Sequence, residues 1–142
     1  MKNIIGLKDA TADLDRVDQQ KQKMGKEFLQ LSGEDATALE FNLRGGSGCI
    51  SVSANVAPKL CSEFQEASLS KNNDNLLSRA KEINDILMPL HKSLFIESNP
   101  SPVKYAASLL KLCSDEVRLP LVTVTPNTKD KIKSAMKNAN LI

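Results

Sequence analysis

Short apolar runs alternate with helical patterns in the first half of the chain. Asn3–Leu7 is an apolar run closed by polar residues, Phe28–Leu31 is a second, and Gly48–Ser53 is a third that contains β-branched residues. Runs of this length, bounded by turn residues, are typical of buried strands. The pattern therefore predicts three strands, the first of which meets a loop at Lys8.

Apolar residues at helical spacing follow each run. Asp13 offers an N-cap to a helix that Gly25 ends, a second helix is expected over Ala38–Leu43, and Pro58 opens a third that carries apolar residues up to Leu69. Strands separated by helices of roughly ten to fifteen residues predict right-handed crossovers and a parallel sheet. The fold class is therefore α/β, with a sheet that is either open or part of a barrel.

The second half of the chain has a helical pattern throughout. Asn75–Ile96 is predicted to be a long amphipathic helix, a pair of prolines interrupts it, Val103–Leu112 resumes as a helix, and a last helix begins near Thr128. We therefore expect an α/β portion over residues 1–70 and a carboxy-terminal helical region over residues 71–142.

Length, charge and cysteine usage bound the class of protein. The 142 residues suffice for one ordinary domain, and 19 basic against 17 acidic residues leave a net charge of +2, too weak to attract nucleic acid. The sequence has no signal peptide and no apolar run that could cross a bilayer. Three widely spaced cysteines, Cys49, Cys61 and Cys113, suit reduced thiols. A cytoplasmic protein without nucleic-acid or membrane partners is expected.

The ends of the predicted strands supply the candidate site residues. In parallel α/β folds, reactive groups gather where the carboxyl ends of strands open into loops. This rule selects Lys8, the Gly33–Glu34 turn and the stretch from Ile50 to Asn55. A pocket poor in water would lower the pKa of the Lys8 amine, and a neutral amine is a nucleophile toward carbonyls. A lysine after a strand is more often a solvated surface group, so the motif alone leaves both alternatives open.

Other polar features are weaker candidates. Asp9 could tune the neighbouring amine, although helix capping or plain exposure is commoner for such a residue. Gly45–Gly48 follows a helix and precedes a strand, the reverse of the order in a phosphate loop, so we expect a tight turn with positive φ. The only histidine, His91, lacks a strand-end serine partner and metal-ligand spacing, so neither a triad nor a metal site is predicted.

Five segments resemble the dihydrodipicolinate synthase family, in order along the chain. They are Asn3–Thr11, Leu31–Leu39, Gly45–Pro58, Phe95–Lys104 and Arg118–Leu121. The wider superfamily, which includes the sialic acid and keto-deoxy-sugar lyases, shares the lysine strand. The third and fourth segments favour the synthase.

The resemblance implies a (β/α)8 TIM barrel, of which this chain supplies the sixth, seventh and eighth strand-helix units and the helical region. It also implies a Schiff-base lyase of lysine biosynthesis that condenses pyruvate with aspartate semialdehyde. No cofactor is implied, because the covalent imine with pyruvate serves as the electron sink. Carried over by position, Lys8 forms the imine, Ile50 lines the pyruvate pocket and Gly33 lies near the same site.

The resemblance also shows what this chain lacks. The family's tyrosine and threonine proton relay belongs mainly to the first five strand-helix units, and the only tyrosine here, Tyr105, falls in the helical region and is not assigned that role. Three strands cannot close a barrel, which takes about 250 residues, and they leave unpaired edges and an apolar face. We therefore expect a homo-oligomer or a complementing amino-terminal half. The chain is either an enzyme in such an assembly or an inactive truncated remnant that only folds and oligomerises.

Overall fold

A computed structural model describes residues 3–70 and 73–142. The elements in chain order are β1 (Gly6–Asp9), α1 (Asp15–Met24), β2 (Leu29–Ser32), the 3-10 helix η1 (Asp35–Thr37), α2 (Ala38–Leu43), the 3-10 helix η2 (Ser53–Asn55), α3 (Pro58–Leu69), α4 (Asp74–Ser93), α5 (Ser101–Leu109) and α6 (Pro126–Asn138). They form two compact units, Met1–Ser51 with Glu63–Lys81 and Val52–Ser62 with Glu82–Ile142. The expected division at residue 70 stays a prediction.

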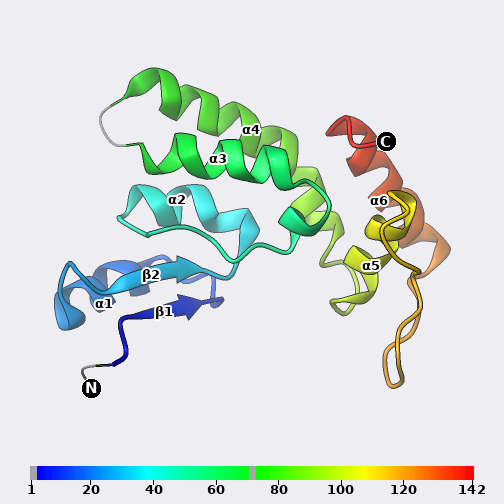
Figure 1. Cartoon of the computed structure of the whole chain (residues 1–142), viewed down its shortest axis with the longest axis horizontal. Helices are drawn as coiled ribbons and strands as arrows, with labels where there is room; N and C mark the ends of the chain where they lie inside the picture. Colours follow the sequence, from blue (N-terminus) through cyan, green and yellow to red (C-terminus); the bar gives the residue numbers. More distant parts are fainter. Residues whose placement is uncertain (1–2, 71–72) are drawn as a thin grey trace. The chain divides into compact units, whose positions relative to one another are not determined.

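The first unit contains a short parallel sheet. β1 and β2 lie side by side, with Lys8 opposite Leu31 and Asp9 opposite Ser32 (Figure 1). An isolated parallel bridge between Ser32 and Cys49 extends the pairing to the segment after α2. The direction of all three segments is therefore parallel, as the alternation of strands and helices predicted.

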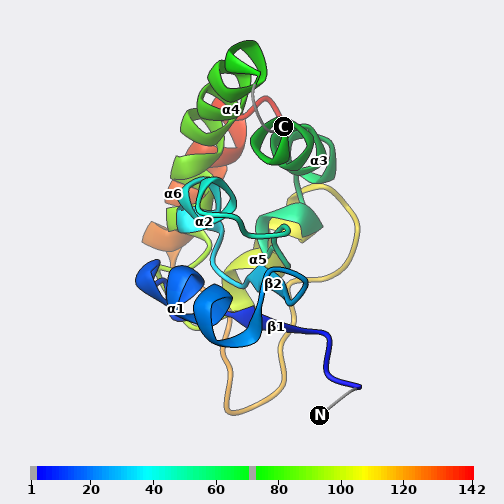
Figure 2. The same ribbon diagram turned by 90° about the vertical axis from the view of Figure 1, so that its left-hand side faces the viewer.

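Helix α1 covers one face of this sheet (Figure 2). Gln30 in β2 donates a hydrogen bond from Nε2 to the carbonyl oxygen of Val17 at 3.1 Å, and Val17 is buried. The predicted N-cap residue, Asp13, accepts a hydrogen bond from the N–H of Asp15 at 3.1 Å. Gly25 ends the helix with a φ of +88°. The predicted end of α1 at Gly25 is thus confirmed, whereas the N-cap position is Leu14, one residue after the predicted Asp13 and without a side-chain cap bond.

The apolar run before Lys8 is exposed, so the prediction of a buried first strand was wrong for this chain. The strand begins only at Gly6, and Ile4, Ile5 and Leu7 are exposed, Ile5 by 69%. An apolar run becomes buried in a sheet when both its edges are paired and both its faces are covered. Among the described residues, β1 pairs with β2 alone.

The third strand is much shorter than the predicted range Gly48–Ser53. Ser32 donates from its N–H to the carbonyl of Gly48 and accepts from the N–H of Ile50, both at 2.8 Å, and the chain then turns into η2. Among the described residues, this segment pairs with β2 through one bridge only. The turn before it has the expected positive φ, +104° at Gly45 and +137° at Gly48.

The second unit is built around the buried side of its helices. The predicted apolar stripe of α4 is confirmed from Ala80 to Leu90 except at Ile86, which is exposed like Leu76, and the helix ends at Ser93 rather than Ile96. Helices α5 and α6 also begin within two residues of their expected starts. The largest side chains with 0% exposure here are Ile83, Leu87, Leu90, Leu94, Ile132 and Met136. No helix in the described ranges combines the length and apolar character needed to cross a membrane.

Polar contacts hold the start of α6 in the second unit. Glu97 Oε1 accepts hydrogen bonds from the N–H and the hydroxyl of Thr125, at 3.0 and 2.7 Å. The ammonium of Lys129 lies 4.9 Å from the ring centre of Tyr105 and 3.5 Å from Asp115 Oδ2. The chain's only tyrosine is therefore a buried packing residue beneath a lysine.

Candidate active site at the strand ends

Backbone hydrogen bonds tie together the carboxyl ends of the three parallel segments. The N–H of Gly33 donates to the carbonyl of Asp9 at 2.7 Å, and the N–H of Ile50 donates to the carbonyl of Ser32 at 2.8 Å. The predicted site residues Lys8, Gly33 and Ile50 therefore come from three successive strand ends at one edge of the sheet, as the parallel fold requires.

The side chain of Lys8 lies directly over Gly33. A Cβ atom added to Gly33 would stand 2.7 Å from Lys8 Cε and 2.7 Å from the Cβ of Ala10, closer than real Cβ atoms approach their neighbours. A glycine at position 33 therefore leaves room for the side chain of Lys8. Lys8 is exposed, but its side chain follows the strand ends instead of leaving them.

Lys8 and Ile50 occupy the face of the sheet that α1 does not cover. Asp9 and Gln30 bond to residues of α1, so the alternation of side chains along a strand directs Lys8 to the opposite side. We name this side the open face, defined by Lys8, Leu29, Leu31 and Ile50. Leu29 is 46% and Ile50 50% exposed, so the open face presents apolar surface around the amine.

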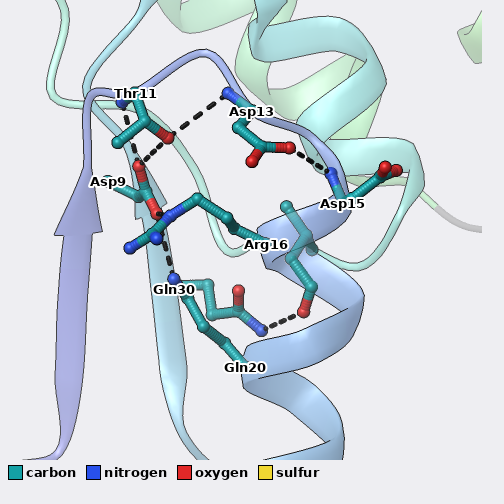
Figure 3. A network of polar contacts seen from close by, with 8 residues as sticks. Asp9, Thr11, Asp13, Asp15, Arg16, Gln20 and Gln30 are labelled. Atoms are coloured by element: carbon teal, nitrogen blue, oxygen red, sulfur yellow. Dashed lines mark hydrogen bonds and ion pairs between the residues drawn. The ribbon is translucent and has the colours of Figure 1, made fainter.

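Asp9, next to Lys8, is buried, so plain exposure, one of the three alternatives considered for it, is excluded. Its Oδ1 accepts hydrogen bonds from the N–H of Thr11 at 2.9 Å and from the Thr11 hydroxyl at 2.6 Å. Its Oδ2 accepts from Arg16 Nε at 2.6 Å and from Gln20 Nε2 at 2.9 Å (Figure 3). The carboxylate thus joins the end of β1 to the following loop and to α1.

The surroundings of Asp9 favour its ionised form. Burial by itself would raise the pKa of the carboxyl, but the hydrogen bonds from Thr11, Arg16 and Gln20 outweigh burial and hold the pKa well below its ordinary value of 3.8. Asp9 therefore stays charged in the folded chain at pH values where an aspartate in the unfolded chain already binds a proton.

We expect the contribution of Asp9 to stability to be lost in acid. Because the folded pKa is lowered, the contribution is fully present above pH 3.8 and declines as the pH falls below that value, where the unfolded chain takes up the proton first. Urea unfolding of the wild type and of Asp9→Asn should differ by a constant free energy above this pH and by progressively less below it. A difference that does not change with pH would contradict the assignment.

Replacing Gly33 by alanine should slow any reaction of the Lys8 amine with pyruvate. The new methyl group would displace Lys8 Cε, and a displacement of about 1 Å can lower the rate of a positioned reaction by up to roughly 100-fold. Trapping by borohydride as a function of time measures the effect. Gly25→Ala is the control for a strained glycine substitution away from Lys8: a Cβ there meets no atom within 4 Å, so despite the strain at its positive φ it should leave the trapping rate per folded molecule unchanged.

A serine–histidine pair that the sequence did not predict lies in the second unit. His91 Nδ1 is 2.6 Å from the hydroxyl oxygen of Ser53, and both side chains are buried. The expectation that His91 lacks a serine partner from the third strand segment was therefore wrong. Since Ser53 has 0% exposure, the pair contributes to packing and not to a surface site.

The sequence that forms these strand ends matches a known protein family. Residues 1–139 match the sequence profile of the dihydrodipicolinate synthetase family. The chain belongs to this family. Membership confirms the resemblance carried by the five segments, and it confirms the α/β fold class. The individual roles of Lys8, Gly33 and Ile50 stay predictions.

Individual members of the dihydrodipicolinate synthetase family cover the chain from end to end. The 4-hydroxy-tetrahydrodipicolinate synthase of Pelagibacter ubique is 65% identical over 142 residues, which are 100% of this chain and 48% of that protein. The dihydrodipicolinate synthase of Thermotoga maritima superposes with a TM-score of 0.90 at 36% identity, over 99% of this chain and 48% of that one. A chloride-inhibited synthase from Acinetobacter baumannii, solved in complex with pyruvate, gives a TM-score of 0.90 at 38% identity, over 99% and 47%. The chain spans about half the length of these relatives.

Proposed function

We propose that this chain carries the imine-forming lysine of a dihydrodipicolinate synthase, within the last three strand-helix units of a (β/α)8 barrel. The reaction is the condensation of pyruvate with aspartate semialdehyde in lysine biosynthesis, a lyase activity of the cytoplasm. The observation that carries the proposal is the place of Lys8, over Gly33 and on the same face as Ile50, at the strand ends of a chain of this family.

The chemistry proposed for Lys8 is that of an amine nucleophile. Its Nζ attacks the carbonyl carbon of pyruvate, and loss of water leaves a protonated imine. The imine withdraws electrons, so the pyruvate methyl group gives up a proton and becomes an enamine carbon that bonds to the aldehyde carbon of aspartate semialdehyde. Water then releases the product and restores the amine. The apolar side chain of Ile50 would line the pyruvate pocket, and Gly33 leaves the space that the lysine needs.

We further propose that the open face and the outer edge of β1 receive a complementing amino-terminal half of the barrel. The open face is apolar and half-exposed, and the chain spans about half the length of its relatives. A proton relay typically contributes ~10² to 10⁴-fold in rate. The only tyrosine of this chain, Tyr105, is buried beneath Lys129 in the second unit and is not assigned to such a relay. The relay would therefore come from the complementing half, and the chain alone should have almost no turnover.

Mixing experiments test the proposal. The chain is combined with the amino-terminal half of the Pelagibacter ubique synthase, and a coupled assay follows the consumption of pyruvate and aspartate semialdehyde. We expect turnover from the mixture, none from either part alone, and none when the mixture contains Lys8→Arg. Turnover that survives in the Lys8→Arg mixture would contradict the role of Lys8. Parallel assays with the aldehyde substrates of sialic acid and keto-deoxy-sugar lyases separate the synthase from these related activities.

A second candidate function is that of an inactive fragment which only folds and associates with copies of itself. The exposure of the open face favours it, because exposed apolar surface tends to associate with another copy or a partner. Sedimentation at increasing concentration, with and without the complementing half, distinguishes the candidates. A stable homo-oligomer that neither binds the complementing half nor forms a pyruvate adduct would support the inactive fragment.

A further inference from the structure

We propose that Asp9, acting through Thr11, Arg16 and Gln20, is a positioning residue that holds Lys8 over Gly33 for imine formation. The proposal rests on the proposed function of Lys8 and adds to it a group that touches neither substrate nor amine. Asp9 fixes the end of β1 from the helix side of the sheet, whereas Lys8 extends from the open face.

All the acceptor capacity of the Asp9 carboxylate is used. An ionised carboxylate has about four lone-pair positions, and two hydrogen bonds reach each oxygen of Asp9 at distances between 2.6 and 2.9 Å. Two donors come from Thr11 in the loop, and the other two come from Arg16 and Gln20 on successive turns of α1 (Figure 3). The contact with Arg16 is also an ion pair. A carboxylate held in this way has a single orientation.

The orientation of the Asp9 carboxylate is coupled to the position of Lys8 through the backbone. Asp9 follows Lys8 directly in β1, and its carbonyl oxygen accepts the N–H of Gly33 at 2.7 Å. Gly33 is the residue over which the Lys8 side chain lies. A rotation of Asp9 would therefore move the backbone that carries Lys8 and the glycine beneath its side chain at the same time.

Asp9, Gln20 and Gln30 form a polar layer between α1 and the sheet. Its contribution to stability alone does not explain why these positions are polar. In the part of the chain that the structure describes, Gln20 Oε1 and Gln30 Oε1 are buried without a hydrogen-bond partner. A protein whose buried polar groups lack some of their hydrogen bonds is commonly less stable than one with apolar side chains of similar volume at those positions. A polar layer of this kind does define one relative position of helix and strand, which is what a positioned amine requires.

The test compares Asp9→Asn and Arg16→Gln with Asp13→Asn as the matched control. Asp9→Asn replaces one acceptor oxygen by a donor in a site of four donors. Arg16→Gln removes one of these four donors, the Arg16 guanidinium. Because the Arg16 side chain is half-exposed, this second variant should fold even if Asp9→Asn does not. Asp13→Asn removes one negative charge from the same loop but keeps a side-chain oxygen that can accept the N–H of Asp15. Each variant is studied at a temperature at which it is folded.

The first readout is the rate of pyruvate trapping by cyanoborohydride over a range of pyruvate concentrations. A positioning role predicts a maximal rate lower by roughly 10- to 100-fold in Asp9→Asn and Arg16→Gln, with an unchanged half-saturating concentration of pyruvate and an unchanged rate in Asp13→Asn. A purely structural role would leave the rate per folded molecule at the wild-type value, and that result would overturn the proposal.

The second readout does not depend on pyruvate. Reductive methylation with ¹³C-formaldehyde labels the lysines, and Lys8→Arg identifies the Lys8 signal in the carbon–proton spectrum. We expect a distinct Lys8 signal in the wild type and in Asp13→Asn, and a signal among those of solvated lysines in the two network variants. A Lys8 signal that stays in place in both would overturn the positioning role. Absence of a wild-type pyruvate adduct would instead count against the proposed function, and this spectrum would still decide the role of Asp9.

Discussion

Replacing Lys8 by arginine should abolish the pyruvate-dependent mass increase that borohydride produces in this protein. The guanidinium group of arginine does not lose its proton in proteins, so it cannot attack the pyruvate carbonyl. Arginine keeps the positive charge and nearly the length of the side chain, so the sheet should tolerate the change at this exposed position. Mass spectrometry of the intact chain after reduction, with and without pyruvate, measures the result.

Lys23→Arg is the matched control for this substitution. Lys23 is also exposed but lies on α1, away from the strand ends, and should leave the mass increase unchanged. If Lys8→Arg still gained the full mass while Lys23→Arg lost it, the imine would belong to the helix surface and Lys8 would have no role in it.

Replacing Leu90 by alanine should have the largest effect on stability among the changes considered. Leu90 lies in α4 with 0% exposure, and truncation of a buried leucine typically costs 2–5 kcal/mol, so we expect a loss of about 3 kcal/mol in the free energy of unfolding. Urea denaturation followed by far-ultraviolet circular dichroism measures the loss, which corresponds to a shift of roughly 100-fold in the unfolding equilibrium.

Ile86→Ala provides the comparison on the same helix. Ile86 lies one turn before Leu90 at the edge of the stripe and is 38% exposed, so its truncation should cost less than about 1 kcal/mol. Equal losses for Leu90→Ala and Ile86→Ala would mean that the buried stripe of α4 is not the core of the second unit.

The helices were predictable from the sequence because their signals are local. The stripe of α4 repeats every three or four residues, and the caps of α1 lie within two residues of its ends. The parallel direction of the strand segments followed from the same alternation. The strand ends were predictable too, since a parallel sheet brings together the residues that follow each strand, and this placed Gly33 against Lys8.

Burial was less predictable than secondary structure. The apolar run before Lys8 indicates a strand that is covered on both faces, but coverage depends on neighbouring segments that a local pattern does not specify, and Ile5 is 69% exposed. The short third segment has the same cause, because the described residues pair it with β2 alone. Both mismatches concern strand pairing and coverage, which depend on residues far from the strand in the sequence.

Two polar contacts escaped the sequence analysis for different reasons. Ser53 and His91 are 38 positions apart and show no local pattern. The partners of Asp9 are nearer, and the spacing of Asp9 and Thr11 is that of an Asx-turn, a signal that could have predicted a bound carboxylate instead of an exposed one. Its bonds to Arg16 and Gln20 form because α1 packs against the sheet with these two residues facing Asp9. The sequence pattern alone did not predict this orientation of the helix.

Mapping the pyruvate adduct in the wild-type chain tests the central claim most directly. The chain is reduced with borohydride in the presence of pyruvate and then digested with trypsin, which does not cleave after a modified lysine. We predict an uncut peptide over residues 3–16 that carries one carboxyethyl group on Lys8. An adduct on any other lysine, or no adduct beside a trapped relative of full length, would contradict the account.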